Sequence, residues 1–443
     1  MKKPNLKPNA IVAFFVIAAT VISCKSGTVN LFKTASPHEQ YQKRLSSAGL
    51  DKTAMGLAWI NAAANSIAKA PTVTLPFREK GYFAAEKVPA SAYNFKAVKG
   101  QKISVALAQK PVEQFRIYVD LIKRDTDKLK LLAFADTLKN TIEYEIEDSG
   151  DYLLRIQPEL LGSGEYTLDI NYGPSLNYPI KSTSRNHTQS FFGDGRDADT
   201  RKHEGIDMFA PLRTPVVAAA NGVVTRVNEN NLGGRVVWMR PAGKNYTLYY
   251  AHLDQQIAKE GQEVKIGDTL GLMGNTGNAK TTSPHLHFGI YGFGGAVDPF
   301  PFVNPSIKPL PEVSASLNNL NATMRTNAKA TVYQSPETAA ASITTLNQNT
   351  IVSVTAASKN WYKVLLQDNL EGFVQSSRLN PTTRAIKTIK VKPSQLLAFD
   401  KPDSSAATKI TLARNAEVDL LGYFGAYQLI KDSKNQTGWI IIE

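Results

Sequence analysis

Two histidines stand one residue apart in the stretch SPHLHFG, although the whole chain of 443 residues holds only six histidines. The neighbouring Leu286, Phe288 and Ile290 favour a β-strand. On a strand, residues i and i+2 point to the same side, so His285 and His287 would share one face while Leu286 and Phe288 pack on the other. Two imidazoles on one face suit a metal ion or a water-filled cleft better than an apolar core.

A second cluster lies upstream in RKHEGIDMFAP, where His203 and Asp207 are four residues apart. That spacing places both side chains on one face of a helix. Gly205 and the following TPVVAAANGVVTRV favour an extended segment instead, in which His203 and Asp207 again share a face. Two imidazoles and one carboxylate around a metal, with one position open for water, form the pattern of a catalytic zinc site.

The remaining histidines divide into one that joins this region and two that stand alone. His252 lies in LYYAHLDQ, which predicts a strand with an exposed imidazole at its end. Four histidines and one aspartate exceed the needs of one catalytic zinc ion, and the spare imidazoles could act on the attacking water and on the developing oxyanion. His38 and His187 have no partner in the sequence and are expected at the surface.

The order of these motifs resembles that of the lysostaphin/LytM-type zinc endopeptidases of bacterial cell walls. RKHEGIDMFAP, TPVVAAANGVV, YAHL, GNTGNA and SPHLHFG all match the pattern of that family, within residues 180–305. The resemblance implies an antiparallel-β domain in which His203, Asp207 and His287 bind zinc. It also implies that His252 and His285 are catalytic, and leaves open which of the two is the base.

Two further positions in this region bear on the resemblance. The glycine-rich run GDTLGLMGNTGNAKTTSPH lacks the G-K-[ST] of a phosphate-binding loop, so we interpret it as tight turns and a cleft wall, with Asn275 as a candidate substrate contact. Arg213 stands where the family usually has glycine, at a turn away from the ligands.

The N-terminus predicts a lipid anchor. Lys2, Lys3 and Lys7 precede an apolar stretch that is too short to span a bilayer and that ends in VISC. This resembles the lipobox of bacterial lipoproteins, and implies that residues 1–23 are a signal peptide and that Cys24 is lipidated. The alternative is an uncleaved anchor with an incidental cysteine. A lipoprotein would face the periplasm or the cell surface, and a single cysteine allows no internal disulfide.

The rest of the chain predicts a mainly β, multidomain protein. Residues 24–72 read as a helical tether. Residues 73–175 alternate with a period of two and loosely resemble a pre-peptidase C-terminal type of β-sandwich. A linker rich in Pro, Ser and Asn follows at 306–322. Beyond it, a repeat at an offset of 66 residues predicts two small SH3-like barrels, 323–381 and 382–443, which would either bind wall peptides or act as spacers.

The overall charge indicates which kind of macromolecule the protein would bind. The formal net charge is +13, and the Lys and Arg residues are spread along the chain without a compact run, which argues against a nucleic-acid site and suits an anionic wall polymer. The leading hypothesis is a monomeric zinc endopeptidase that hydrolyses the peptide cross-links of peptidoglycan. The alternatives are a catalytically silent LytM-type activator of other wall hydrolases and a wall-binding structural lipoprotein.

Overall fold

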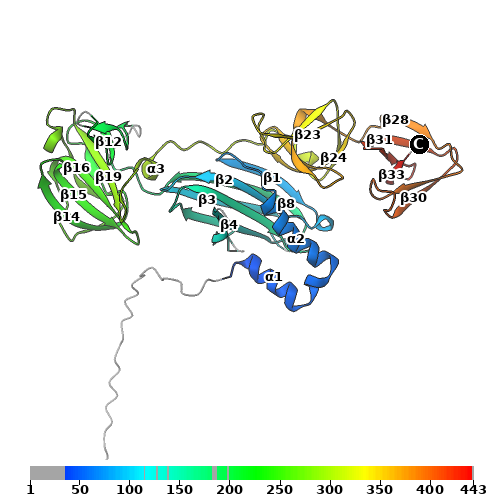
Figure 1. Cartoon of the computed structure of the whole chain (residues 1–443), viewed down its shortest axis with the longest axis horizontal. Coiled ribbons are helices and arrows are strands. Elements are labelled where there is room, and N and C mark those ends of the chain that lie inside the picture. The colour runs from blue at the N-terminus through cyan, green and yellow to red at the C-terminus, as the bar shows by residue number, and fades with distance from the viewer. Residues whose placement is uncertain are drawn as a thin grey trace, which may run out of the picture. The chain divides into compact units, whose positions relative to one another are not determined.

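The computed structural model describes residues 35–113, 115–125, 128–136, 139–181, 187–196 and 199–441, and β-strands are their main secondary structure (Figure 1). The predicted signal peptide and Cys24 lie outside the described residues. Within those residues, no helix is long and apolar enough to cross a membrane. The mainly β, multidomain fold class predicted from the sequence is confirmed.

Two helices open the described chain. Helix α1 (Pro37–Ser47) begins with a capping box between Ser36 and Glu39. Helix α2 (Ala54–Ala68) begins after Thr53, whose side chain accepts a hydrogen bond from the Gly56 N–H. Asp51, a residue type that favours the N-cap position, lies before this helix in a 3₁₀ turn, Leu50–Lys52.

These helices pack against the β-sandwich, where the sequence indicated a spacer. His38 is only 2% exposed, so the prediction of a surface histidine is wrong. Its ring stacks on Trp59 with centroids 4.6 Å apart, and its Nε2 lies 2.6 Å from Oε1 of Gln157. Nη2 of Arg155 lies 2.9 Å from His38 Nδ1. Because a guanidinium can only donate, the His38 ring is neutral and carries its proton on Nε2.

The β-sandwich has two antiparallel layers around one core. The period-two pattern holds, since Ile117, Val119 and Leu121 are buried in this core. Tyr118 on the opposite face is also buried, because it packs beneath Leu45 and Trp59 of the helices. One layer contains β2 (Ser91–Ala97), β7 (Gly150–Pro158), β4 (Ile117–Asp125) and β5 (Lys128–Phe134), and the other contains β1 (Phe77–Phe83), β8 (Gly164–Pro174), β3 (Gln101–Lys110) and β6 (Thr141–Glu145).

The histidine-rich region forms a ten-stranded antiparallel sheet of its own, with strand order β17-β14-β15-β16-β19-β12-β9 along its main path. Its core is apolar and fully enclosed, and includes Leu286 and Phe288 at 0% exposure. The strands of the path are β9 (Thr188–Ser190), β12 (Ile206–Phe209), β14 (Gly222–Asn230), β15 (Gly234–Pro241), β16 (Tyr246–Gln256), β17 (Glu263–Val264) and β19 (His285–Gly292). Strands β13 (Pro215–Val217), β18 (Thr269–Met273) and β20 (Gly295–Val297) pair beside it, a hairpin β10 (Gly195–Arg196) and β11 (Arg201–Lys202) precedes β12, and helix α3 (Phe300–Val303) closes the region.

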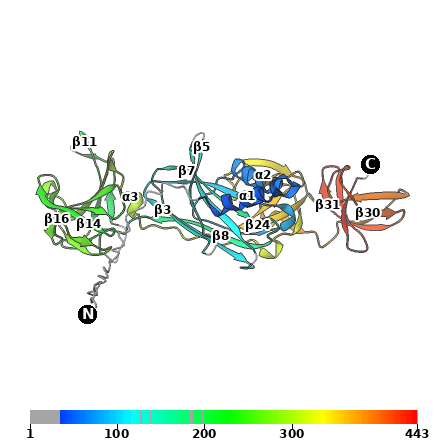
Figure 2. The same cartoon turned by 90° about the horizontal axis from the view of Figure 1, so that it is seen from below.

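The C-terminal strands recur at the offset of 66 residues that the sequence indicates, since each of the five strands of one set maps onto its counterpart in the other. The first set is β22 (Ala330–Tyr333), β23 (Ser342–Leu346), β24 (Ile351–Ser358), β25 (Trp361–Leu365) and β26 (Glu371–Gln375), flanked by β21 (Thr323–Thr326) and β27 (Leu379–Pro381). The second set is β29 (Gln395–Phe399), β30 (Thr408–Ala413), β31 (Glu417–Phe424), β32 (Tyr427–Lys431) and β33 (Thr437–Ile441), preceded by β28 (Lys387–Lys390). Figure 2 labels β24 of the first set and β30 and β31 of the second.

The first C-terminal set joins the sandwich directly. Strand β24 pairs antiparallel with β1, with Lys80 opposite Ala357, so that the two units share one eleven-stranded sheet. The Ser358 hydroxyl donates to the Arg78 carbonyl at 2.7 Å. The histidine-rich region is therefore inserted, in sequence, between two units that pair with each other.

Candidate metal centre

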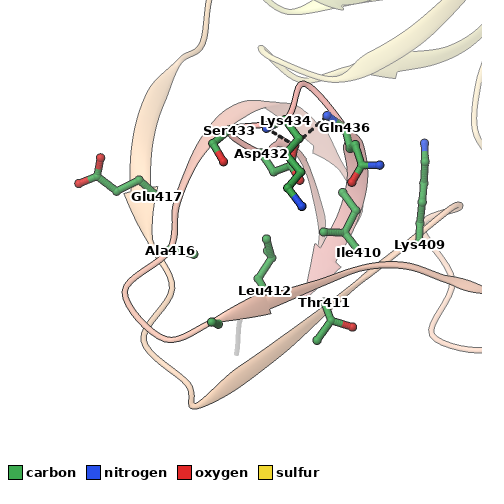
Figure 3. A pocket seen from close by; sticks show the side chains of 11 residues that line it. Lys409, Ile410, Thr411, Leu412, Ala416, Glu417, Asp432, Ser433, Lys434 and Gln436 are labelled. Atoms are coloured by element: carbon green, nitrogen blue, oxygen red, sulfur yellow. Dashed lines mark hydrogen bonds between the residues drawn. The ribbon is translucent and has the colours of Figure 1, made fainter.

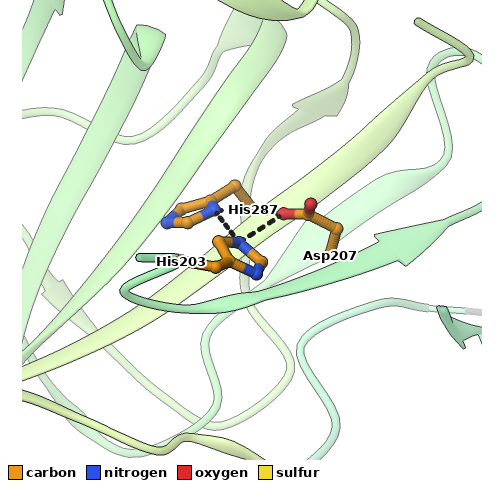
Figure 4. A group of neighbouring side chains, drawn as sticks. All are labelled: His203, Asp207 and His287. Carbon is orange, nitrogen blue, oxygen red and sulfur yellow. Dashed lines mark hydrogen bonds and ion pairs between the residues drawn. The ribbon is translucent and has the colours of Figure 1, made fainter. Parts of the chain in front are cut away.

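Three side chains converge to form the centre of the histidine-rich region (Figure 4). His203 Nε2 lies 3.1 Å from Asp207 Oδ1 and 3.0 Å from His287 Nδ1. His287 Nδ1 lies 3.0 Å from the same Asp207 oxygen. The three atoms thus form a nearly equilateral triangle, built from the two sequence clusters as expected.

Strand pairing explains why these residues meet. Asp207 on β12 lies directly opposite His287 on β19, so both side chains leave the same face of the sheet. His203 precedes β12, and it reaches the cluster from a non-strand segment, whereas the sequence indicated one extended segment from His203 through Gly205 to Asp207. Gly205 makes room for this approach, because a Cβ there would lie 2.7 Å from the His287 ring.

A shell of outer partners fixes the cluster. His203 Nδ1 lies 2.9 Å from the Phe191 carbonyl, to which it donates, so that Nε2 is left to face the centre. Arg196 Nη2 donates to Asp207 Oδ2 and to Ser190 Oγ, both at 2.7 Å. This ion pair occupies one oxygen of Asp207 and leaves the other, Oδ1, for the two imidazoles. Ser190 Oγ in turn lies 3.3 Å from His203 Nδ1.

The donor set fits a zinc ion. Two imidazole nitrogens and one carboxylate oxygen at about 2.0 Å from a tetrahedral zinc would be separated by about 3.3 Å. The observed separations of 3.0 and 3.1 Å are within a few tenths of an ångström of that edge length. Three protein ligands leave a fourth position open, which is the composition of catalytic rather than structural zinc sites.

Two further imidazoles lie beside the triangle without belonging to it. The His252 ring lies 4.9 Å from that of His285 and 5.9 Å from that of His287, centroid to centroid. His252 Nδ1 lies 2.8 Å from the Thr276 carbonyl, and His285 Nδ1 lies 2.9 Å from the Ser283 carbonyl. Because a carbonyl oxygen can only accept, each Nδ1 carries a hydrogen and donates it, and each Nε2 is the ring nitrogen left for other partners.

The surroundings of His252 differ from the exposed strand end that the sequence predicted. His252 is only 7% exposed, and it lies within β16 in the left-handed region at φ +62°, beside an irregularity in the pairing of β16. A non-glycine residue in that conformation is strained and is held there by its surroundings. His285 is stacked on Phe209, with ring centroids 4.8 Å apart. Both rings are thus oriented by fixed partners.

Burial and charge set the protonation of the cluster. Burial alone would raise the pKa of Asp207, but the hydrogen bonds and charges of His203 and His287 outweigh it and hold that pKa well below its usual range. Burial lowers the pKa of His252 to about 4, and the neighbouring His285 and His287 add to this effect. Burial also lowers the pKa of His287, against the opposing effect of Asp207. At neutral pH the Asp207 carboxylate is therefore ionised, and the rings of His252 and His287 are neutral. Metal binding needs an ionised carboxylate and a neutral imidazole, and general-base chemistry needs a neutral imidazole.

Other sequence predictions meet a mixed outcome. The Asn275 amide donates at 3.4 and 3.3 Å to carbonyls of its own loop, Lys280 and Thr282, while the next residue, Thr276, is the one that contacts His252. The role of Asn275 as a substrate contact stays a prediction. Arg213 adopts φ +64°, a conformation that favours glycine, and its side chain pairs with Asp254 at 3.3 Å.

Sequence reasoning missed the outer partners Arg196, Ser190 and Phe209. None of them stands at a diagnostic spacing from the histidines, and the Phe191 contact is made by a backbone carbonyl that any residue supplies. Only the fold brings them to the cluster, so no signal in the sequence could have identified them.

A separate hollow of about 450 Å³ lies in the last β unit, between β30 and the turn before β33 (Figure 3). Its apolar floor is made by Ile410 and Leu412. The one carboxylate of the turn, Asp432, already accepts from the backbone N–H groups of Lys434 and Gln436. This hollow holds no histidine and is not part of the metal centre.

Comparison with known proteins agrees with the geometry. Residues 201–299 match the model of Peptidase family M23, and residues 328–380 match the model of the bacterial SH3 domain. The first range contains all five residues of the cluster and its neighbours. The chain therefore contains a peptidase M23 domain and a bacterial SH3 domain, which confirms these two parts of the sequence prediction.

Individual relatives are similar over the peptidase region. The chain is 40% identical over 88 residues to the peptidoglycan DD-endopeptidase ShyC of Vibrio cholerae, covering 20% of each chain. It is 33% identical over 136 residues to the L-Ala--D-Glu endopeptidase of Bacillus subtilis, covering 28% of this chain and 41% of that one. The chain thus spans about a fifth and about two fifths of these relatives. Among solved structures, the catalytic domain of lysostaphin from Staphylococcus simulans is 29% identical with a TM-score of 0.24, covering 26% of this chain and 90% of that chain.

Proposed function

We propose that this protein is a zinc-dependent endopeptidase that hydrolyses the peptide cross-links of bacterial peptidoglycan. The observation that carries the proposal is the triangle of His203, Asp207 and His287 with two further imidazoles, His252 and His285, beside it. A purely structural metal site would have no use for the two additional rings. The names of the similar endopeptidases support the choice of a wall peptide as substrate.

In this proposal His203 Nε2, His287 Nδ1 and Asp207 Oδ1 hold the zinc ion. A zinc ion bound there would polarise the scissile carbonyl and lower the pKa of a water molecule toward neutrality. Arg196 keeps Asp207 in place and satisfies its second oxygen, so that the carboxylate binds through one atom.

The two other imidazoles manage protons. His252 and His285 each donate through Nδ1 to a backbone carbonyl, so the Nε2 atom of each ring is the one that can exchange a proton with the substrate. The low pKa of His252, about 4, keeps its ring in the acceptor form at neutral pH. One of these rings accepts the proton of the attacking water. The protonated ring then stabilises the tetrahedral oxyanion or returns the proton to the leaving amine.

The remaining domains would place the peptidase at its substrate. We propose that Cys24 is lipidated and anchors the protein to a membrane, outside the cytoplasm. The bacterial SH3 domain, and the second β unit as another SH3-like domain, would bind the wall. Several weak contacts to one polymer lengthen the time that the protein stays bound, through avidity. The net charge of +13 favours an anionic polymer. We propose that the protein works as a monomer.

The test is direct. Residues 25–443 are expressed, bound zinc is quantified, and the protein is incubated with purified cross-linked peptidoglycan, whose fragments are identified by mass spectrometry. We expect about one zinc per chain and new free amino groups. His252→Ala and His285→Ala should each abolish cleavage while zinc stays bound, and His187→Ala, in the same domain but outside the cluster, should leave cleavage intact.

The other outcomes are equally informative. Zinc without cleavage would favour the catalytically silent activator. Loss of zinc from His252→Ala or His285→Ala would show that ligands and catalysts have been assigned wrongly. Full cellular function of the zinc-site variants would favour the structural lipoprotein.

A further inference from the structure

The sheet face that carries the metal cluster continues beyond it as an aromatic strip. The Tyr249 ring lies 5.9 Å from the His287 ring, and the Trp238 ring lies 4.3 Å from that of Tyr249. Tyr291 completes the strip, with its centroid 5.6 Å from that of Trp238. The register agrees, because Trp238 on β15 and Gly289 on β19 both lie opposite Tyr249 on β16.

Glycine keeps this strip flat. Gly289 separates His287 from Tyr291 on the same face of β19, and a Cβ at Gly289 would lie 2.9 Å from Cε2 of Tyr291. The Tyr291 ring therefore lies against the strand backbone instead of standing upright. A flat aromatic surface next to the reacting centre can receive an extended chain without a side chain blocking its path.

The strip leads to a cavity of about 450 Å³ at the far end of the strands. Thr247, which lies opposite Tyr291, is part of its wall. Phe293 stands fully exposed at the tip of the β19–β20 hairpin and borders the same cavity. An aromatic side chain that is fully exposed beside a cavity gains free energy when a ligand covers it.

The cavity also presents an unpaired cation. Lys244 on its wall forms an ion pair with Glu145 of the sandwich. The Arg240 guanidinium is exposed and, among the residues that the structure describes, has no ion pair or hydrogen bond. A guanidinium presents a planar fork of donors that matches a carboxylate.

The distance suits a peptide. Phe293 follows the last residue of β19, Gly292, which lies about 17 Å from His287 at about 3.3 Å per residue. Tyr291 lies about 13 Å from His287 by the same measure. A peptide whose scissile bond lies at the metal would reach the cavity with its fourth to sixth extended residue.

We propose that the strip and this cavity form a distal subsite for the carboxylate-bearing arm of the peptide substrate. The peptide arm lies over Tyr291 and Trp238, and its carboxylate pairs with Arg240. The Phe293 ring then packs over the end of the arm. The proposal rests on the proposed function, because it takes the same peptide that is cleaved at the metal. A glycan strand stripped of its peptides also carries carboxylates, on the lactyl groups of its muramic acids, but has no peptide arm to lie over the strip, and it is the occupant that the test must exclude.

The test measures binding, so that it does not depend on catalysis. Cross-linked peptide dimers released from purified peptidoglycan are labelled with fluorescein, and their affinity for full-length His285→Ala is measured by anisotropy. The same dimers with their carboxylates coupled to methylamine are measured in parallel. We expect the free carboxylates to bind about tenfold more tightly, as is typical of a hydrogen-bonded charge pair.

Arg240→Gln, added to His285→Ala, should remove this preference, and Phe293→Ser should weaken both dimers. Arg226→Gln, an exposed arginine of the same sheet outside the cavity, is the matched control and should change neither affinity. Zinc content and thermal unfolding should be unchanged in all variants. The subsite would be overturned if the free carboxylates showed no preference at all, if that preference survived Arg240→Gln, or if Arg226→Gln removed it equally. Stronger competition by glycan strands stripped of peptide would overturn it as well. Binding with this pattern but without cleavage by the wild type would support the subsite and overturn the endopeptidase.

Discussion

The buried His38 makes the stability of the helix–sandwich contact depend on pH. Burial, with a further effect of the Arg155 charge, lowers the pKa of His38 from 6.5 to about 4. The ring therefore stays neutral in the folded protein at a pH where the unfolded chain takes up a proton. The contribution of the neutral His38 ring to the free energy of unfolding is fully present above about pH 6.5 and is lost progressively as the pH falls toward about 4.

The size of the effect follows from the two pKa values. Each tenfold difference in proton affinity is worth about 1.4 kcal/mol. This single group should lower the free energy of unfolding by about 2 kcal/mol between about pH 7.5 and about pH 5, and by about 3 kcal/mol at about pH 4. A protonated ring would also present an Nδ1–H to the Arg155 guanidinium, 2.9 Å away, where only an acceptor fits.

Urea unfolding curves at several pH values, followed by tryptophan fluorescence, measure this effect. His38→Gln serves as the comparison, because it keeps a side-chain amide near Gln157 but has no group that titrates in this range. The variant should be less stable at about pH 7.5 because the stacking on Trp59 is lost, and the gap should close by about 2 kcal/mol on going to about pH 5. Parallel pH profiles for the two proteins would refute the reasoning, because the loss at low pH would then arise elsewhere.

Three further predictions concern other contacts. Arg196→Ala should weaken zinc binding by about 10- to 100-fold, because the substitution frees Asp207 to rotate. Competition against a chelating dye measures the zinc affinity, and an unchanged zinc Kd would show that Arg196 does not position Asp207. Gly205→Ala should lose zinc, because its Cβ would lie 2.6 Å from the Phe288 carbonyl oxygen and 2.7 Å from the His287 ring. Gly292→Ala, whose Cβ meets nothing closer than 3.9 Å, should bind zinc normally in the same assay. Ile351→Asp should separate the two C-terminal β units, because this fully buried side chain packs against Leu421 and Trp439 of the second unit. Limited proteolysis should release the second unit from that variant but not from Ile343→Asp, whose site is exposed.

The sequence predicted those parts of the site that depend on local spacing. His285 and His287 share a face because a strand has a period of two, and the alternation with buried Leu286 and Phe288 made that period visible. The meeting of this strand with Asp207 is a long-range pairing, and it followed from the resemblance to a known family and not from any local pattern.

The sequence predictions are wrong where packing between distant segments determines which side chains are buried. His38 carries no spacing signal, and its partner Gln157 lies on a strand that is distant in sequence, so the sequence could not indicate its burial. The buried face of α2 is centred on Trp59 and Ala63, while Leu57 of the same helix is 49% exposed. The helix is alanine-rich and has several apolar faces, and the position of the sandwich selects one of them.

The pairing of β1 with β24 has a consequence for biosynthesis. Strand β1 lies near the N-terminus, whereas its partner β24 is synthesised only after the entire peptidase domain. Until then the outer edge of the sandwich exposes unpaired backbone groups, which invite pairing with the wrong chain. Contacts between residues so distant in sequence also form slowly, because a long loop must close first. The nascent chain therefore carries a temporarily open sheet edge through most of its emergence, and a folding helper that covers strand edges would protect it during that interval.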